Sequence, residues 1–223
     1  MFKWLSKYFA SPAELREAGI LGMNSRNFKF IAKQNKRRLY PLVDDKVQTK
    51  ALALQYGINT PRLIGTINYQ HEVDRLPLLV KDWPSFVIKP AHGSGGKGVL
   101  VIKSHDGETF VTPSGRSLTY KEIYQHISNT LSGLYSLGGQ YDTAVIEEMV
   151  NFSHIFDSYS YQGIPDVRII VYKGYPVMAM TRLATAASGG RANLHQGAVG
   201  VGLDIKTGKT LKAVMRNMPI THH

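Results

Sequence analysis

Residues 86–98 read FVIKPAHGSGGKG, and residues 99–102 continue as VLVI. The runs FVIKP and VLVI are short, apolar and rich in β-branched residues, as is typical of strands. Between them lie four glycines within six residues, which is more conformational freedom than a plain turn requires. The stretch therefore predicts a strand, a glycine-rich loop and a second strand, joined as a hairpin.

The spacing of these glycines matches G-x-G-x-x-G, but the flanking residues exclude three familiar phosphate loops. A dinucleotide-binding loop is followed by a helix, whereas a strand follows here. A P-loop requires Ser or Thr after its lysine and an earlier glycine, but Gly98 follows Lys97 and Ala91 stands at the earlier position. A protein kinase has its strand lysine after the loop and carries H-R-D and D-F-G motifs, which this chain lacks.

The loop is nevertheless suited to an anion. Glycines allow several backbone N–H groups to point into one concavity. Lys97 adds a positive charge within the loop, and Lys89 lies at the end of the preceding strand, where it can reach a phosphate. The alternative is a flexible surface hairpin with a solvated lysine, and the entropic cost of four glycines argues against it.

Before the hairpin the chain has a helical pattern. Ser11 and Pro12 predict the start of a helix that ends near Ala18. Asn24 is expected to cap a second helix, to Asn35, and Asp44 a third, which Gly57 terminates. A short helix is expected over residues 72–79, just before the first strand of the hairpin.

After the hairpin the pattern is mixed and then mainly extended. Residues 109–118 predict a second hairpin, and Thr119 with Glu122 forms a capping box that opens a helix to about Leu137, before Gly138-Gly139. Strands are expected in the segments AVIEEMV, DVRIIVY, PVMAMTRLA, GAVGVGLDI and TLKAVMR, with turns at residues 173–174 and 206–209. Together these elements predict an α+β fold with a mainly antiparallel sheet.

Composition narrows the class of protein. Hydrophobic residues make up 43% and charged residues 19%, which predicts a packed core. There is no cysteine, so disulfides, Cys-ligated metals and thiol nucleophiles are excluded. With no secretion signal and no apolar stretch of ~18 residues, a cytoplasmic protein is expected. The net charge of +11 favours anionic partners, and residues 33–38 (KQNKRR) form either a solvated face or a nucleic-acid contact.

Five motifs follow one another along the chain: D-K-x-x-T-K with G-I-x-T-P, F-V-I-K-P with G-S-G-G-K-G, V-I-E-E-M-V, D-V-R-I-I-V, and R-x-N-L-H-x-G. In this order they resemble the ATP-grasp superfamily, and most of all its RimK-type, alpha-L-glutamate ligase-like branch. The resemblance spans residues 44–202. It implies an ATP-grasp fold with a helical N-terminal region (1–60), a first lobe with the glycine loop (61–150) and the start of a second lobe (151–223).

The resemblance also implies which residues bind ATP. Lys46 would lie near the nucleotide, and Lys89 would contact the α-phosphate and the edge of the adenine. The mobile loop over the β- and γ-phosphates would consist of Gly93, Ser94, Gly95, Gly96, Lys97 and Gly98. The linker strand whose backbone reads the adenine would consist of Glu147, Glu148, Met149 and Val150. A solvated Lys46, and Met149 and Val150 as ordinary core residues, are the simpler alternatives.

The resemblance implies that four further residues take part in catalysis: Arg168, Arg182, Arg191 and Asn193. Arg168 shares a strand face with Asp166, so these two residues either pair or Arg168 points toward the active site. The implied reaction transfers the γ-phosphate of ATP, with Mg²⁺, to a carboxylate, and an amino-acid-like amine then attacks the acyl phosphate. His195, a lone loop histidine, is expected to be structural or solvated.

The chain departs from the family in its acidic residues. After Glu148 the only acids are Asp157, Asp166 and Asp204, and none stands in the E-x-N setting that binds Mg²⁺ in the family. No metal ligand is therefore assigned, and a fragment of a longer reading frame is expected. The alternatives are a catalytically inactive nucleotide-binding module and, less favoured because the aromatic residues are scattered, a nucleic-acid-binding protein. Related ATP-grasp chains are also linked to cell-surface sugar metabolism.

Overall fold

The computed structural model describes residues 9–136, 138–151, 154–161, 163–216 and 218–221. The chain forms two compact units, Met1–Thr60 and Pro61–His223. The first unit is helical. Its elements are α1 (Pro12–Glu17), α2 (Met23–Ser25), the π-helix η2 (Arg26–Ala32), the 3-10 helix η3 (Arg37–Leu39), α3 (Pro41–Asp44) and α4 (Lys46–Gln55).

Local signals explain the starts of helices α1 and α4. The Ser11 hydroxyl accepts from the backbone N–H of Glu14 at 3.2 Å, and the Glu14 carboxylate accepts from the N–H of Ser11. This capping box confirms the predicted start of α1. Helix α4 is capped by Asp45 rather than by Asp44, which ends α3, because the Asp45 carboxylate accepts from the N–H groups of residues 47 and 48.

The predicted second helix is present with altered geometry. It starts at Met23, with Gly22 rather than Asn24 at the N-cap position, and seven of its residues form π-helical turns. Gly57, with φ of +66°, follows α4 and confirms the predicted terminator, since the left-handed conformation favours glycine.

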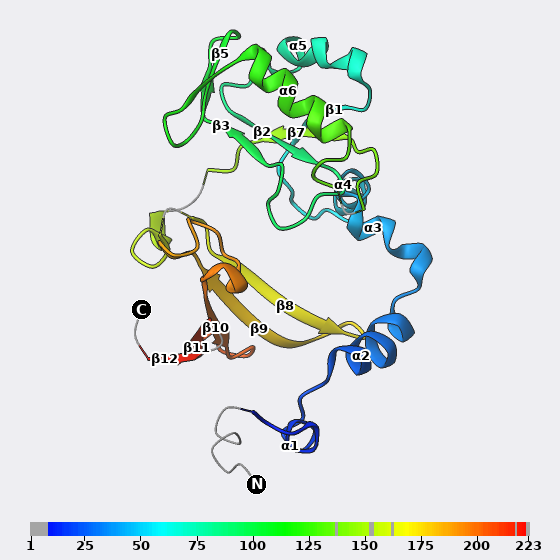
Figure 1. Cartoon of the computed structure of the whole chain (residues 1–223), viewed down its shortest axis with the longest axis vertical. Coiled ribbons are helices and arrows are strands. Elements are labelled where there is room, and N and C mark those ends of the chain that lie inside the picture. Colours follow the sequence, from blue (N-terminus) through cyan, green and yellow to red (C-terminus); the bar gives the residue numbers. More distant parts are fainter. Residues whose placement is uncertain (1–8, 137, 152–153, 162, 217, 222–223) are drawn as a thin grey trace. The chain divides into compact units, whose positions relative to one another are not determined.

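The first part of the second unit is built on a four-stranded antiparallel sheet with the order β1-β7-β2-β3. Its strands are β1 (Leu63–Ile67), β2 (Phe86–Pro90), β3 (Leu100–Ile102) and β7 (Ala144–Glu148). A small sheet of β4 (Ser104–His105), β5 (Thr109–Val111) and β6 (Ser117–Thr119) accompanies it. The helices are η4 (Gln70–Arg75), α5 (Leu76–Val80) and α6 (Tyr120–Leu131). Figure 1 shows α6 lying across the four-stranded sheet.

Helix α6 covers one face of the sheet because its apolar residues recur every four positions. Ile123, Ile127 and Leu131 are buried, and they belong to one core cluster with Phe86 and Phe110. The capping box of Thr119 and Glu122 is confirmed. The helix ends at Leu131, not near residue 137, which itself lies outside the described residues.

The early end of α6 has a local cause. Gly133 has a φ of +83°, and a Cβ at this position would stand 2.1 Å from the carbonyl oxygen of Gln140. Only glycine fits this close approach of two backbone segments. Gly133 therefore turns the chain toward β7, and the Gly138-Gly139 pair that was expected to end the helix lies in the following loop.

The rest of the second unit is a five-stranded antiparallel sheet with the order β12-β11-β10-β9-β8. A 3-10 helix, η5 (His154–Phe156), precedes this sheet in the chain. The strands of the sheet are β8 (Asp166–Tyr172), β9 (Tyr175–Leu183), β10 (Val199–Leu203), β11 (Thr210–Met215) and β12 (Met218–Ile220). Lys173 and Gly174, both with positive φ, form the predicted tight turn between β8 and β9. The described fold is thus α+β with mainly antiparallel sheets, and β12 is the one strand of this sheet that the sequence did not predict.

We expect Ile127→Ala to lower the free energy of unfolding by about 2–5 kcal/mol, because the lost side chain leaves a cavity in the core. Leu134→Ala, at a side chain that is 66% exposed, is the matched control and should change it by less than about 0.5 kcal/mol. Urea unfolding followed by circular dichroism measures both. Equal effects of the two substitutions would contradict the packing of α6 on the sheet.

Candidate functional site

The glycine loop between β2 and β3 has two kinds of glycine. Gly95 and Gly96 have φ of +64° and +76°, and no other group stands near the position of an added Cβ. Gly93 and Gly98 are tightly packed, since a Cβ would lie 2.3 Å from the Pro90 ring and 2.5 Å from the Tyr135 ring. The loop therefore has a closely fitted stem and an open tip.

A buried carboxylate holds the first side of the stem. Asp142 accepts hydrogen bonds from the backbone N–H of His92 at 3.1 Å, from His92 Nδ1 at 2.8 Å and from the Ser136 hydroxyl. It also accepts from the N–H of Thr143. Burial acts to raise the pKa of Asp142, but these hydrogen bonds outweigh it and hold the pKa below its usual value. Asp142 is therefore an anion that fixes the residue just before Gly93.

The second side of the stem is held by α6. The His126 Nε2 atom lies 3.0 Å from the carbonyl oxygen of Gly98, and its ring is tilted over Tyr135. Burial lowers the pKa of His126, although the hydrogen bond to Gly98 opposes this shift. A neutral imidazole that donates from Nε2 fits this position, so the loop is attached to the α6–β7 segment on both sides.

Lys89 lies on the sheet face opposite α6. It forms an ion pair with Glu147 on the neighbouring strand β7. The side chain of Glu147 is 6% exposed and that of Lys89 is 21% exposed. The pair joins the two residues diagonally, because Lys89 is opposite Val145 in the antiparallel register. Two of the predicted nucleotide-binding residues thus meet in the structure, across β2 and β7, and β2 leads into the glycine loop.

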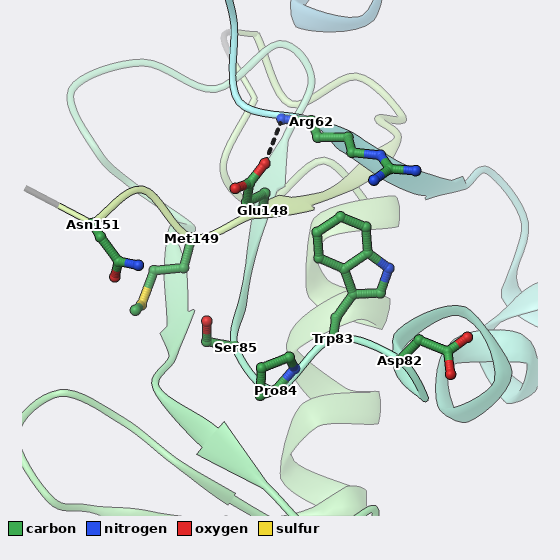
Figure 2. Close-up of a pocket in the computed structure, with 8 residues that line it drawn as sticks. All are labelled: Arg62, Asp82, Trp83, Pro84, Ser85, Glu148, Met149 and Asn151. Atoms are coloured by element: carbon green, nitrogen blue, oxygen red, sulfur yellow. Dashed lines mark hydrogen bonds between the residues drawn. The ribbon is translucent and has the colours of Figure 1, made fainter.

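A pocket of about 540 Å³ lies at the other end of β2, where β7 ends (Figure 2). Glu148 and Met149 from the predicted linker line it, and the remaining lining residues are Arg62, Asp82, Trp83, Pro84, Ser85 and Asn151. The Arg62 guanidinium stands over the Trp83 ring at 5.2 Å.

The backbone around this pocket is already partly used. The N–H of Glu148 donates to the carbonyl of Arg62 at 2.9 Å, and the Glu148 carboxylate accepts from the Arg62 N–H. In this structure the N–H of Glu148 is therefore not offered to a ligand. Met149 and Val150 follow the end of β7, and Val150 is 40% exposed rather than a core residue.

A comparison with protein families gives one match, to the sugar-transfer associated ATP-grasp family, over residues 25–223. The chain belongs to this family. The ATP-grasp superfamily predicted from the motif order is thereby confirmed, whereas the match does not support the RimK-type branch. No curated protein matches the chain.

The five-stranded sheet carries two of the arginines that the ATP-grasp resemblance implies in catalysis, Arg168 and Arg182. Arg182 pairs with Asp166 directly across β8 and β9, through Nε at 2.6 Å and through its terminal nitrogen. The bond from Arg182 lowers the pKa of Asp166, against the opposing effect of burial. Arg168 Nε stands farther from the same carboxylate, at 3.7 Å, and its side chain is 59% exposed. Arg182 is therefore held in an ion pair, whereas Arg168 is largely accessible.

The small-residue loop after β9 is folded through its own hydrogen bonds. The Thr185 hydroxyl donates to the carbonyl of Gly197 at 2.8 Å, and the Thr185 N–H donates to the Ser188 hydroxyl at 2.9 Å. Thr185 and Ser188 are buried. Arg191 is exposed and follows this turn, and Asn193 stands before the 3-10 helix η6 (Leu194–Gln196). The loop thus presents Arg191 from an ordered base.

The remaining residues that were predicted to bind the nucleotide lie in the first unit and in the glycine loop. Lys46 is the half-buried first residue of α4, in the first unit. Ser94 and Lys97 are exposed in the glycine loop. Within the ranges that the structure describes, no three side chains from His, Cys, Asp and Glu gather as a metal site. The described side chains therefore do not form a Mg²⁺ site by themselves.

Sequence reasoning missed the residues that anchor the loop: His92, His126, Tyr135, Ser136 and Asp142. One signal was available, since His92 directly precedes the first glycine and Asp142 stands two residues before β7. Recognising it required the register of β2 with β7, which the residues alone do not specify.

The two kinds of glycine should respond differently to substitution by alanine. Gly95→Ala should lower the free energy of unfolding by about 1–2 kcal/mol, which is the cost of a left-handed backbone. Gly98→Ala should cost more, because the methyl group would also collide with the Tyr135 ring. Urea unfolding compares them, and a smaller loss for Gly98→Ala would show that the stem is loosely packed.

Removing the charge of Asp142 should destabilise the stem. Asp142→Asn is expected to lower the free energy of unfolding at pH 7 by about 1.5–3 kcal/mol, since it removes a buried charged acceptor. The pKa of Asp142 is lowered in the folded protein, so its contribution is full above its usual value of 3.8 and is lost as the pH falls through the lowered value. The difference between the variant and the parent should therefore shrink below about pH 4.

The matched control for Asp142→Asn is Asp82→Asn, at a carboxylate that is 81% exposed. It should leave the unfolding free energy within about 0.5 kcal/mol of the parent. A difference between Asp142→Asn and the parent that stays constant as the pH falls would show that the charge of Asp142 does not act in the way described.

Proposed function

We propose that the chain is an ATP-dependent carboxylate–amine ligase, whose acceptor or product carries a sugar. The observation that carries this proposal is the glycine loop with its fixed stem and open tip, next to Lys89, in a chain of the sugar-transfer associated ATP-grasp family. Glutamate addition, implied by the RimK-type resemblance, is the finer alternative for the amine.

The loop and its neighbouring lysines fit a polyphosphate. Gly95 and Gly96 leave open space at the tip, so their backbone N–H groups can approach phosphate oxygens without a side chain in the way. Lys97 is exposed in the same loop, and Lys89 is held at its start by Glu147. The β- and γ-phosphates would lie under the loop and the α-phosphate near Lys89.

The adenine would lie at the end of β7. Because the N–H of Glu148 is bonded to Arg62, the backbone groups that read the base would come from Met149 and Val150. The Met149 side chain lines the pocket of Figure 2 and offers an apolar wall.

In the proposed reaction a carboxylate oxygen of the acceptor attacks the γ-phosphorus of ATP, and the bond to the β-phosphate oxygen breaks to release ADP. The amine then attacks the acyl carbon, phosphate leaves, and the amine gives up a proton. The loop N–H groups and Lys97 would balance charge on the moving phosphoryl group. Arg168 and Arg191 are exposed and would bind the acyl phosphate. Arg182 would orient Arg168 through Asp166, and Asn193 would contact the phosphates.

Calorimetric titration with ATP, with and without Mg²⁺, tests the nucleotide site. Lys89→Ala should weaken binding by about 1.5–3 kcal/mol, which is roughly 10- to 150-fold, because it removes a charged contact. That variant also leaves the buried Glu147 without Lys89, so the double variant Lys89→Met with Glu147→Gln removes both charges. It should lose ATP as well, while Lys103→Met, at an exposed lysine, should not.

Turnover is tested by ADP release in the presence of carboxylate-bearing sugars and amino acids, with hydroxylamine added to trap an acyl phosphate. ADP release that depends on the carboxylate, together with a hydroxamate product, supports the ligase. ATP binding without such release would identify the inactive nucleotide-binding alternative. If the parent chain binds no ATP while its fold is intact, both are wrong.

A further inference from the structure

The helical unit contains a long segment without acidic residues. Between Glu17 and Asp44 there is no Asp or Glu, whereas six basic residues occur there: Arg26, Lys29, Lys33, Lys36, Arg37 and Arg38. Six of the eleven net positive charges of the chain thus lie in residues 18–43, which we call the basic apolar segment. Such a concentration of positive charge favours binding to an anionic surface.

The same segment exposes large apolar side chains. Met23 is 72% exposed, Phe28 79% and Val43 72%. Five more of its apolar residues are more than a third exposed: Ile20, Leu21, Phe30, Ile31 and Leu39. Scattered exposed apolar residues are normal, but eight occur here within 26 residues, and Phe28, Phe30, Ile31 and Leu39 lie between or beside the cations. This concentration favours a partner that accepts both kinds of side chain.

Apolar and basic side chains also share local surfaces on the helix. Phe28, Lys29, Ala32 and Lys33 line one shallow hollow of about 480 Å³ on η2. An aromatic ring and two lysines thus line the same hollow, and the ammonium group of a lysine can extend from such a place into water. This arrangement suits the boundary between lipid headgroups and acyl chains, where lysine places its stem in the apolar layer and its charge among the phosphates.

We propose that the basic apolar segment binds the surface of a membrane rich in anionic lipid. Nucleic acid would account for the six cations, but it leaves Met23, Ile31 and Val43 without a partner, and an interfacial helix uses both. Among the described helices, none is long and apolar enough to cross a membrane. In this proposal the segment lies at the boundary between lipid headgroups and acyl chains, a role independent of the proposed ligase reaction.

Co-sedimentation of the full chain with vesicles tests this proposal. The chain should bind vesicles of phosphatidylcholine mixed equally with phosphatidylglycerol, should bind pure phosphatidylcholine much more weakly, and should be released in part by salt. Lys29→Gln with Lys33→Gln should weaken binding to the anionic vesicles by about tenfold or more, because each cation near such a surface contributes. Phe28→Ser should weaken it by a similar factor, because the ring no longer enters the apolar layer.

Two matched controls separate local from general effects. Lys206→Gln with Lys209→Gln makes the same change of charge at exposed lysines in the turn before β11, and Leu78→Ser removes a side chain that is 68% exposed on α5. Neither should change vesicle binding by more than about twofold. Circular dichroism checks that every variant remains folded.

The outcomes distinguish the partners. If the parent chain does not bind the anionic vesicles, or if the control variants lose as much binding as the segment variants, the proposal is wrong. If duplex DNA or RNA binds and Phe28→Ser leaves that binding unchanged, while vesicles do not bind, the segment is a nucleic-acid contact instead.

Discussion

The antiparallel register between β2 and β7 is the constraint on which the candidate site depends. Phe86 pairs with Glu148 and Pro90 with Ala144. The same alignment continues after the end of β2 at Pro90 and before the start of β7 at Ala144. It brings the N–H of Ala91 to the carbonyl of Thr143, and it places His92 opposite Asp142. One alignment therefore sets the Lys89–Glu147 pair and the anchor of the glycine loop.

A shift of this register by one residue would be costly. It would turn Phe86 and Ile88 away from α6 and put Lys89 toward the apolar core, because alternate residues of a strand face opposite sides. The burial of Phe86, Ile88 and Ile146 on one face thus protects the polar arrangement on the other. The packing of the core and the geometry of the site therefore depend on the same strand register.

Local signals allowed much of the fold to be predicted from the residues. The hairpin around the glycine loop, the caps at Ser11 and Thr119, and the turn at Lys173-Gly174 all depend on neighbours within a few positions. The N-caps of the second and third helices differ by two residues and one residue from those expected, and the larger errors arose where distant groups decide. Helix α6 ends early because the chain at Gln140 passes close to Gly133, and Asp142 gains its role only through pairing of strands separated by more than fifty residues.

In the candidate site, too, features set by neighbouring residues could be predicted and features set by distant residues could not. The glycine loop and Lys89 could be singled out from composition and order, because flexible backbone and a nearby cation are local properties. The pairing of Asp166 with Arg168 on the same strand face was one of the two possibilities that the sequence offered, and it is present at 3.7 Å. The closer pairing of Asp166 with Arg182 could not be predicted, since it is set by the partner strand β9. The strand that ends at Glu148 could be predicted as an element, but the hydrogen bond from the Glu148 N–H to the Arg62 carbonyl depends on a distant segment.

Strand β8 has a consequence for the behaviour of the protein in concentrated solution. Among the described strands it forms one edge of the five-stranded sheet, and Val167, Ile169, Ile170 and Val171 along it are all at least 49% exposed. Its charges, Asp166 and Arg168, stand at one end only, so the stretch from Ile169 to Tyr172 lacks the charged side chains that protect sheet edges from further pairing. That half of β8 is the place where intermolecular strand addition, and hence aggregation on storage, would begin.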